Sequence, residues 1–367
     1  MKILTVRRLA VVTGLMLSFT TLRAQFLFEP GFSTMLDDNI NNNALQIQDK
    51  IAAFSLTAGH AWDTARWNAI LAYRGNLNYY QNVVDRTNQS HTGSLTVGRT
   101  FGDDEEDMLQ MGFSFGRGFY RGDYSLYDHA LLSASISYKW FLSDRLLGKG
   151  GYAFRSMTFS NIPDFNYSEH VFSGSLSVAA AQSTTVIGES EFGSKFYAAS
   201  GTGSTGRSSA AAVSQLTSGL RIGQGIVEGT GMSLAAKYQW NLQKEMKSLL
   251  LTYGSISDDE LFDDHYGYEG LHASIMLTQI ISESAVLRMT MGTQERLYTS
   301  LAAYDVEGSV LADRRSDRRS YIALTLQKSF ETGFSLKAAF ELIRNKSNDP
   351  FYDYSNQALT IQLAFPF

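Results

Sequence analysis

The stretch ALTIQLAFPF, residues 358–367, decides the fold. Every odd position in it is large and apolar: Leu359, Ile361, Leu363, Phe365 and Phe367. The even positions are small or polar, apart from Pro366. Strict alternation of this kind is typical of a β-strand with one apolar and one polar face.

The same alternation recurs through the chain, and no convincing helical period appears. It predicts 16 strands, near 26–35, 49–60, 65–80, 90–100, 107–120, 128–141, 146–160, 168–180, 184–199, 210–223, 228–243, 265–280, 285–299, 319–329, 334–344 and 354–367. These segments are ten to sixteen residues long, whereas strands of soluble proteins are usually about five or six. Such lengths favour tilted strands that cross a membrane.

The connections between these segments alternate in length. Short connections, such as 61–64 and 142–145, alternate along the chain with longer ones, such as 36–48, 244–264 and 300–318. Bacterial outer-membrane barrels have short periplasmic turns, long external loops and an even number of strands. Fourteen strands are the alternative, because Pro30 interrupts the first segment and the region 200–227 is weakly patterned.

The composition fits the same fold. Charged residues make up 18% of the 367 residues, against about 25% in an ordinary soluble domain. The mean hydropathy of −0.14 argues against a helical membrane protein but suits a barrel, in which only half of each strand faces lipid. The absence of cysteine excludes a disulfide scaffold, a thiolate metal site and a cysteine nucleophile.

The N-terminus has the pattern of a secretory signal peptide. Lys2, Arg7 and Arg8 precede an apolar run over 9–21, and Ala24 is a small residue at the expected cleavage site. We therefore expect a signal peptide over 1–24 and a barrel over 25–367. An exported chain makes a nucleic-acid partner improbable.

The last ten residues resemble the C-terminal assembly signal of Gram-negative outer-membrane barrels. The matching positions are Leu359, Ile361, Leu363, Phe365 and Phe367. The resemblance implies insertion by the barrel-assembly machinery. The stretches 161–178 and 345–367 are similar to uncharacterised outer-membrane barrel proteins, and more loosely to the barrel of surface-lipoprotein assembly modifiers. No functional residues carry over from either group.

The alternation also assigns charged residues to the lumen, because a charge facing lipid is costly. The basic set is Arg66, Arg74, Lys139, Lys149, Arg155, Lys195, Arg221, Lys237, Arg288, Arg296 and Lys337, and the acidic set is Glu29, Glu189, Glu191 and Glu341. This basic excess predicts a pore that prefers anions. The alternative is a closed barrel whose internal charges form ion pairs. Arg99, Arg117 and Lys328 fall on the lipid-facing phase, near strand ends from which they can reach the headgroups.

The external loops hold two kinds of charge cluster. We expect the acidic residues of 37–38 and 258–264 to be solvated rather than to bind Ca²⁺, because no EF-hand spacing is present. The run ADRRSDRR, residues 312–319, is predicted to be an external loop whose arginines pair with its own aspartates.

A catalytic site is not indicated. His272 lies two residues from Ser274, and His265 lies beside Asp263 and Asp264, but neither arrangement is a triad. We predict no catalytic residues, no metal and no cofactor.

The sequence therefore predicts an all-β, transmembrane, antiparallel up-and-down barrel in a Gram-negative outer membrane. The favoured function is a porin-like passive channel for small solutes, with 244–264 and 300–318 as candidates for a constriction loop inside the lumen. The alternatives are a non-conducting anchor or adhesin and a secretion or assembly partner. Membrane lipid and lipopolysaccharide are expected partners, and homo-oligomerisation is left open.

Overall fold

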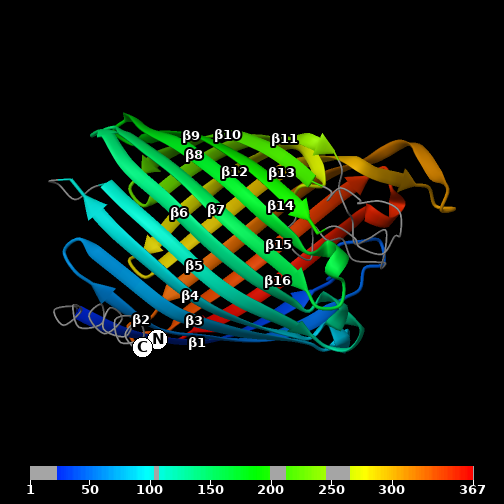
Figure 1. Ribbon diagram of the computed structural model, residues 1–367, viewed down its shortest axis with the longest axis horizontal. Coiled ribbons are helices and arrows are strands. Elements are labelled where there is room, and N and C mark those ends of the chain that lie inside the picture. Colours follow the sequence, from blue (N-terminus) through cyan, green and yellow to red (C-terminus); the bar gives the residue numbers. More distant parts are fainter. Residues whose placement is uncertain (1–22, 103–106, 199–211, 245–264, 367) are drawn as a thin grey trace, which may run out of the picture.

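The computed structural model describes residues 23–102, 107–198, 212–244 and 265–366. They form one closed antiparallel barrel of 16 strands (Figure 1). Each strand pairs with its neighbours along the chain, and β1 closes the barrel against β16, where Gly31 lies opposite Ala364. The prediction of 16 strands is confirmed and the 14-strand alternative is wrong.

The elements have the following bounds. The strands are β1 (Arg23–Asp37), β2 (Asp49–Asp63), β3 (Trp67–Tyr80), β4 (Asn88–Phe101), β5 (Asp107–Tyr120), β6 (His129–Ser143), β7 (Leu146–Phe159), β8 (Tyr167–Ala181), β9 (Thr184–Tyr197), β10 (Ala212–Val227), β11 (Thr230–Lys244), β12 (Tyr268–Ser282), β13 (Ala285–Tyr304), β14 (Val310–Ser329), β15 (Ser335–Ser347) and β16 (Tyr354–Ala364). Four short 3₁₀ helices lie in the connections: η1 (Val84–Arg86), η2 (Gly122–Tyr127), η3 (Pro163–Phe165) and η4 (Pro350–Tyr352). Among the described residues, no helix is long and apolar enough to cross a membrane.

The two ends of the barrel differ. The short turns lie at one end, together with the start of β1 and the end of β16 (Figure 1). The longer connections, with all four 3₁₀ helices, lie at the other end. Strand β1 begins at Arg23, one residue before the predicted cleavage site. Residues 1–22 of the predicted signal peptide lie outside the described residues.

The segment 300–318 is not the loop that the sequence predicted. Strand β13 continues to Tyr304 and β14 begins at Val310, and a bulge between Leu297 and Ala302 interrupts their pairing. The composition of the arginine-rich run is typical of a loop, but the run is part of strand β14. Arg315 and Asp317, two residues apart, lie on the same face of this strand and are hydrogen-bonded to each other. In Figure 1 this orange hairpin reaches past the other strands, away from the barrel, so it is not a constriction loop inside the lumen.

The barrel carries its apolar side chains on the outside. Large apolar residues at alternate positions of the strands are exposed, among them Phe113, Leu324 and Ile361. The main buried apolar cluster lies instead at the long-loop end, between the last residues of β7 and the connections, and consists of Tyr127, Met157, Phe159, Ile162 and Phe165. An apolar outer surface with a more polar inner side is the arrangement that a lipid bilayer stabilises.

Candidate functional site

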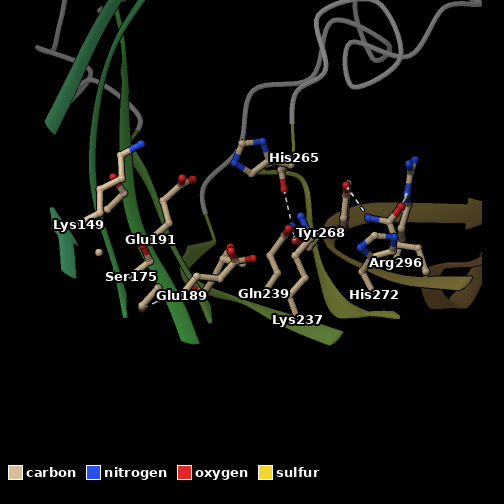
Figure 2. Close-up of a pocket in the computed structure, with 15 residues that line it drawn as sticks. Lys149, Ser175, Glu189, Glu191, Lys237, Gln239, His265, Tyr268, His272 and Arg296 are labelled. Atoms are coloured by element: carbon tan, nitrogen blue, oxygen red, sulfur yellow. Dashed lines mark hydrogen bonds between the residues drawn. The ribbon is translucent and has the colours of Figure 1, made fainter. Parts of the chain in front are cut away.

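A polar cavity of about 640 Å³ lies on the inner side of the barrel (Figure 2). Residues from seven successive strands, β7 to β13, contribute to its wall. Side chains from so many neighbouring strands converge on one space only on the concave side of a closed sheet. This cavity is therefore part of the lumen.

Opposite sides of the cavity carry different charges (Figure 2). Strand β9 contributes Glu189 and Glu191, next to Lys149 of β7. Strands β11 to β13 contribute Lys237 and Arg296, with polar neighbours from the same strands. Five of the predicted lumen residues thus come together around one cavity.

Some of these charges are already compensated. A carboxylate oxygen of Glu189 lies 3.7 Å from a guanidinium nitrogen of Arg221, and both side chains are about half exposed. Arg296 donates from Nε to Oε1 of Gln294 at 3.1 Å, and its guanidinium lies 4.9 Å from the ring centre of Tyr268. These contacts hold the side chains against the wall and leave less charge for a passing solute.

Lys149 and Lys237 differ from these groups. Within the described part of the chain, neither lysine forms a hydrogen bond or an ion pair, although both line the cavity. An ammonium group without a partner keeps its hydration and its full charge in the lumen. These two lysines are the side chains best placed to attract an anion.

The end of the connection before β12 folds into the lumen. The backbone carbonyl of His265 accepts hydrogen bonds from Nε2 of Gln215 at 2.9 Å and from Nε2 of Gln239 at 2.7 Å. The hydroxyl of Tyr266 donates to Oε1 of Glu169 at 2.8 Å. The connection is thereby fastened to the walls formed by β8, β10 and β11. Residues 245–264, the other predicted constriction loop, lie outside the described residues.

Lys195, predicted to line the pore, is instead almost completely buried. Its Nζ lies 4.0 Å from the ring centre of Tyr167, 5.0 Å from that of Tyr197 and 5.8 Å from that of Tyr266. Cation–π contacts of this kind stabilise an ammonium group that has little access to water. Lys195 therefore supports the wall next to Tyr266.

The remaining predicted lumen residues do not meet at this cavity. Arg155 lies 3.5 Å from the buried carboxylate of Glu169, and Arg221 pairs with Glu189 as described above. Seven other predicted lumen residues do not line it: Glu29, Arg66, Arg74, Lys139, Arg288, Lys337 and Glu341. For them, a position in the lumen stays a prediction.

The histidines singled out in the sequence do not form a catalytic arrangement in the described part of the chain. Nε2 of His272 lies 3.1 Å from the hydroxyl of Tyr321, and the two rings are stacked. His265 stacks on Tyr266, with ring centres 4.9 Å apart. The described residues contain no group of three His, Asp or Glu side chains arranged to hold a metal ion.

The three basic residues on the lipid-facing phase each lie over an aromatic ring. Arg99 lies 4.9 Å from the ring centre of Trp67, Arg117 lies 5.9 Å from that of Phe119, and Lys328 lies 5.0 Å from that of Phe330. Each is within a few residues of a strand end. Aromatic rings and basic side chains near the strand ends of a membrane barrel are typical of the boundary between hydrocarbon and headgroups.

No family model matches the sequence, and no curated protein matches it either. Solved structures do match. The outer membrane protein OpdK from Pseudomonas aeruginosa superposes with a TM-score of 0.51 over 94% of this chain and 99% of its own, at 8% sequence identity. OpdQ from the same organism gives a TM-score of 0.51 at 9% identity, over 94% and 99% of the two chains. OpdL, also from Pseudomonas aeruginosa, gives 0.50 at 8% identity, over 94% and 99%.

The chain has the fold of these barrels. Coverage of nearly the whole of both chains means that the similarity extends over almost the entire barrel. At such low identity the comparison concerns the fold alone, and the function has to be argued from the cavity.

Proposed function

We propose that this protein is a passive diffusion channel for small polar solutes in the outer membrane of a Gram-negative bacterium. The observation that carries the proposal is the polar cavity on the inner side of a 16-stranded barrel. Barrels of about 16 strands are wide enough to hold an aqueous channel. The apolar outer surface suits a position in lipid.

We further propose that the channel prefers anions. Glu169 is compensated by Arg155 and Tyr266, and Glu189 by Arg221. Lys149 and Lys237 keep their charge toward the cavity, against the one carboxylate there, Glu191, that has no ion pair among the described residues. An excess of positive charge along the path of a solute attracts anions and repels cations. The larger basic set predicted for the lumen acts in the same direction.

A non-conducting barrel is the second candidate, and the internal pairing favours it. Arg155 and Arg221 each meet a carboxylate, and Lys195 is enclosed by tyrosines. A barrel whose inner charges hold its walls together serves as an anchor or adhesin, or as a secretion or assembly partner. Nothing in the described residues favours catalysis.

Swelling of liposomes that contain the purified barrel separates these two functions. A channel admits a small sugar and swells the vesicles at a rate that falls with solute size, whereas an anchor leaves them unchanged. Vesicles without protein give the background rate. Absence of swelling at protein levels verified in the vesicles contradicts the channel.

We also propose that the last strand is read by the barrel-assembly machinery. Leu359 and Ile361 face outward on β16, Phe365 directly follows this strand, and all three are exposed, while Phe367 lies outside the described residues. A Phe367→Ala variant is expected to reach the outer membrane at a lower level than the unchanged protein. Phe351→Ala in η4 is the control, because η4 lies in a connection at the other end of the barrel.

A further inference from the structure

One group of side chains on the outer face of the barrel combines charge with hydrogen-bond donors. It consists of Tyr73 on β3, His91 on β4, and Arg117 and Phe119 on β5, and is called here the outer-rim group. His91 lies opposite Arg117 in the pairing of β4 with β5. All four side chains are exposed. The group therefore forms a continuous patch across three strands.

Contacts inside the group fix its geometry. The hydroxyl of Tyr73 lies 2.7 Å from Nδ1 of His91. The tyrosine ring reaches this nitrogen by passing over Gly75. A side chain at that position would obstruct the ring, since its Cβ atom would lie only 2.7 Å from the hydroxyl oxygen of Tyr73. The guanidinium of Arg117 and the ring of His91 both lie against Phe119. Within the described residues, Nε2 of His91 and the Arg117 guanidinium keep their hydrogen-bonding capacity.

The group lies at the boundary of the apolar band. Strand β5 has 14 residues, which at a rise of about 3.3 Å and a tilt of about 40° cover about 35 Å of bilayer depth. The apolar band of an outer-membrane barrel is about 25 Å tall, so the strand extends about 5 Å beyond it at each end. Arg117 stands three residues before the last one, Tyr120, or about 8 Å below that end. Its long side chain reaches the headgroups from there.

No carboxylate forms an ion pair with Arg117 among the described residues, and Asp128, just before β6, accepts instead from the backbone N–H of Tyr120 at 2.6 Å. Within the described strands β3 to β6, the outward positions hold a single carboxylate, Asp107, at the opposite end of β5. A basic group at the edge of hydrocarbon is favourable when an anion meets it in the headgroup layer. Arginine binds phosphate through paired hydrogen bonds, and an imidazole N–H adds a further donor.

We propose that the outer-rim group binds the phosphate group of an anionic lipid in the leaflet at the long-loop end. Arg117 contributes the charge and the paired donors, and His91 donates from Nε2 while Tyr73 holds its ring through Nδ1. This inference rests on the outer-membrane location proposed above, in which that leaflet carries lipid A.

The barrel contains a natural control for this site. On β7 and β8, the hydroxyl of Tyr152 lies 2.8 Å from Nδ1 of His170, which repeats the tyrosine–histidine pair at the equivalent positions of another strand pair. Around His170, however, lie the rings of Phe154 and Phe196. No arginine contacts this second pair among the described residues, so it does not meet the requirements for phosphate.

Native mass spectrometry of the purified barrel in detergent tests the proposal. The probes are diphosphoryl lipid A, the same lipid after removal of both phosphates, and inorganic phosphate. We expect the unchanged barrel to bind diphosphoryl lipid A at least about tenfold more tightly than the dephosphorylated lipid, a factor in the range of one charge-assisted contact. Inorganic phosphate alone is expected not to bind.

The variants Arg117→Gln and His91→Ala are expected to lose this preference, whereas Arg99→Gln and His170→Ala are expected to keep it. Heat-modified mobility in gels verifies that each variant is folded, and Arg117→Lys provides a milder change if Arg117→Gln fails to fold. Equal binding of the two lipids, or unchanged preference in folded Arg117 and His91 variants, overturns the proposal. Liposome swelling on the same preparation is a separate readout, so a failed channel and a failed lipid site are distinguishable.

Discussion

The hydroxyl of Tyr266 donates a hydrogen bond of 2.8 Å to the carboxylate of Glu169, and the two residues are 97 positions apart in the chain. Both are buried. Tyr266 lies two residues before β12, near the end of the connection from β11, and Glu169 lies on β8. Together with the hydrogen bonds that the His265 carbonyl accepts, this contact fixes where the connection enters the lumen.

Removing the hydroxyl in Tyr266→Phe should lower the free energy of unfolding by about 1.5–3 kcal/mol, because a buried charged acceptor loses a donor. Urea titration of the barrel in lipid vesicles measures the change. Tyr79→Phe is the matched control, since Tyr79 is exposed on the outer face. An equal effect of the two substitutions would show that the contact does not hold the connection.

The space that the Tyr266 side chain occupies gives a second prediction. The hydroxyl of Tyr266 occupies the space in which a Cβ atom of residue 193 would stand, so only glycine leaves room for it. We expect Gly193→Ala to displace the ring and to weaken the same hydrogen bond. Because both changes act on one contact, Gly193→Ala combined with Tyr266→Phe should cost less than the sum of the two separate effects. Strict additivity in a double-mutant cycle would refute the shared cause.

Two ion pairs of similar length allow a direct comparison of burial. Arg315 and Asp317 are 2.5 Å apart and their side chains are 5% and 1% exposed, whereas Arg344 and Asp353 are 2.6 Å apart with 49% and 38% exposed. Replacement of Arg315 by alanine leaves a buried unpaired carboxylate, and should cost about 3–5 kcal/mol. Arg344→Ala should cost about 1 kcal/mol or less. Thermal and urea unfolding of the two variants provide the test. Similar losses of stability in both would contradict the expectation that the buried ion pair contributes more than the exposed one.

Arg315 also allows a finer test. Its guanidinium lies 4.2 Å from the ring centre of Tyr298 and 3.2 Å from that of Tyr352. A planar group fits between two rings, and an ammonium group does not reproduce its stacking or its paired hydrogen bonds. Arg315→Lys should therefore recover only a small part of the stability lost in Arg315→Ala. Full recovery would mean that charge alone matters at this position.

The barrel itself could be predicted from the sequence because a period of two is local. Leu359, Ile361 and Leu363 reveal the face of their strand without any knowledge of the rest of the chain. The prediction that arginines of 312–319 pair with their own aspartates holds for Arg315 and Asp317, whereas Arg318 pairs with Glu295 of β13. The loop predicted there is a strand. Because charged residues occupy both faces of this strand, it lacks the alternation of apolar and polar residues by which the other strands were predicted.

The site was predicted less completely, because it depends on closure of the barrel. Lys149 and Lys237 were assigned to the lumen by parity, and the structure places both at one cavity. No pattern indicated that Tyr266 reaches Glu169 or that Lys195 is enclosed by tyrosines. Contacts between residues that are distant in the chain leave no signal in the period of a single strand.

The reversal potential of the barrel in a planar bilayer under a KCl gradient is the most direct test of an anion-preferring channel. We expect stepwise conductance with a reversal potential displaced toward the chloride equilibrium value. Lys149→Glu combined with Lys237→Glu should move the reversal potential toward the potassium value, while Lys328→Glu on the outer face should leave it unchanged. A silent bilayer, or a cation-selective potential in the unchanged protein, would show that the barrel is not such a channel.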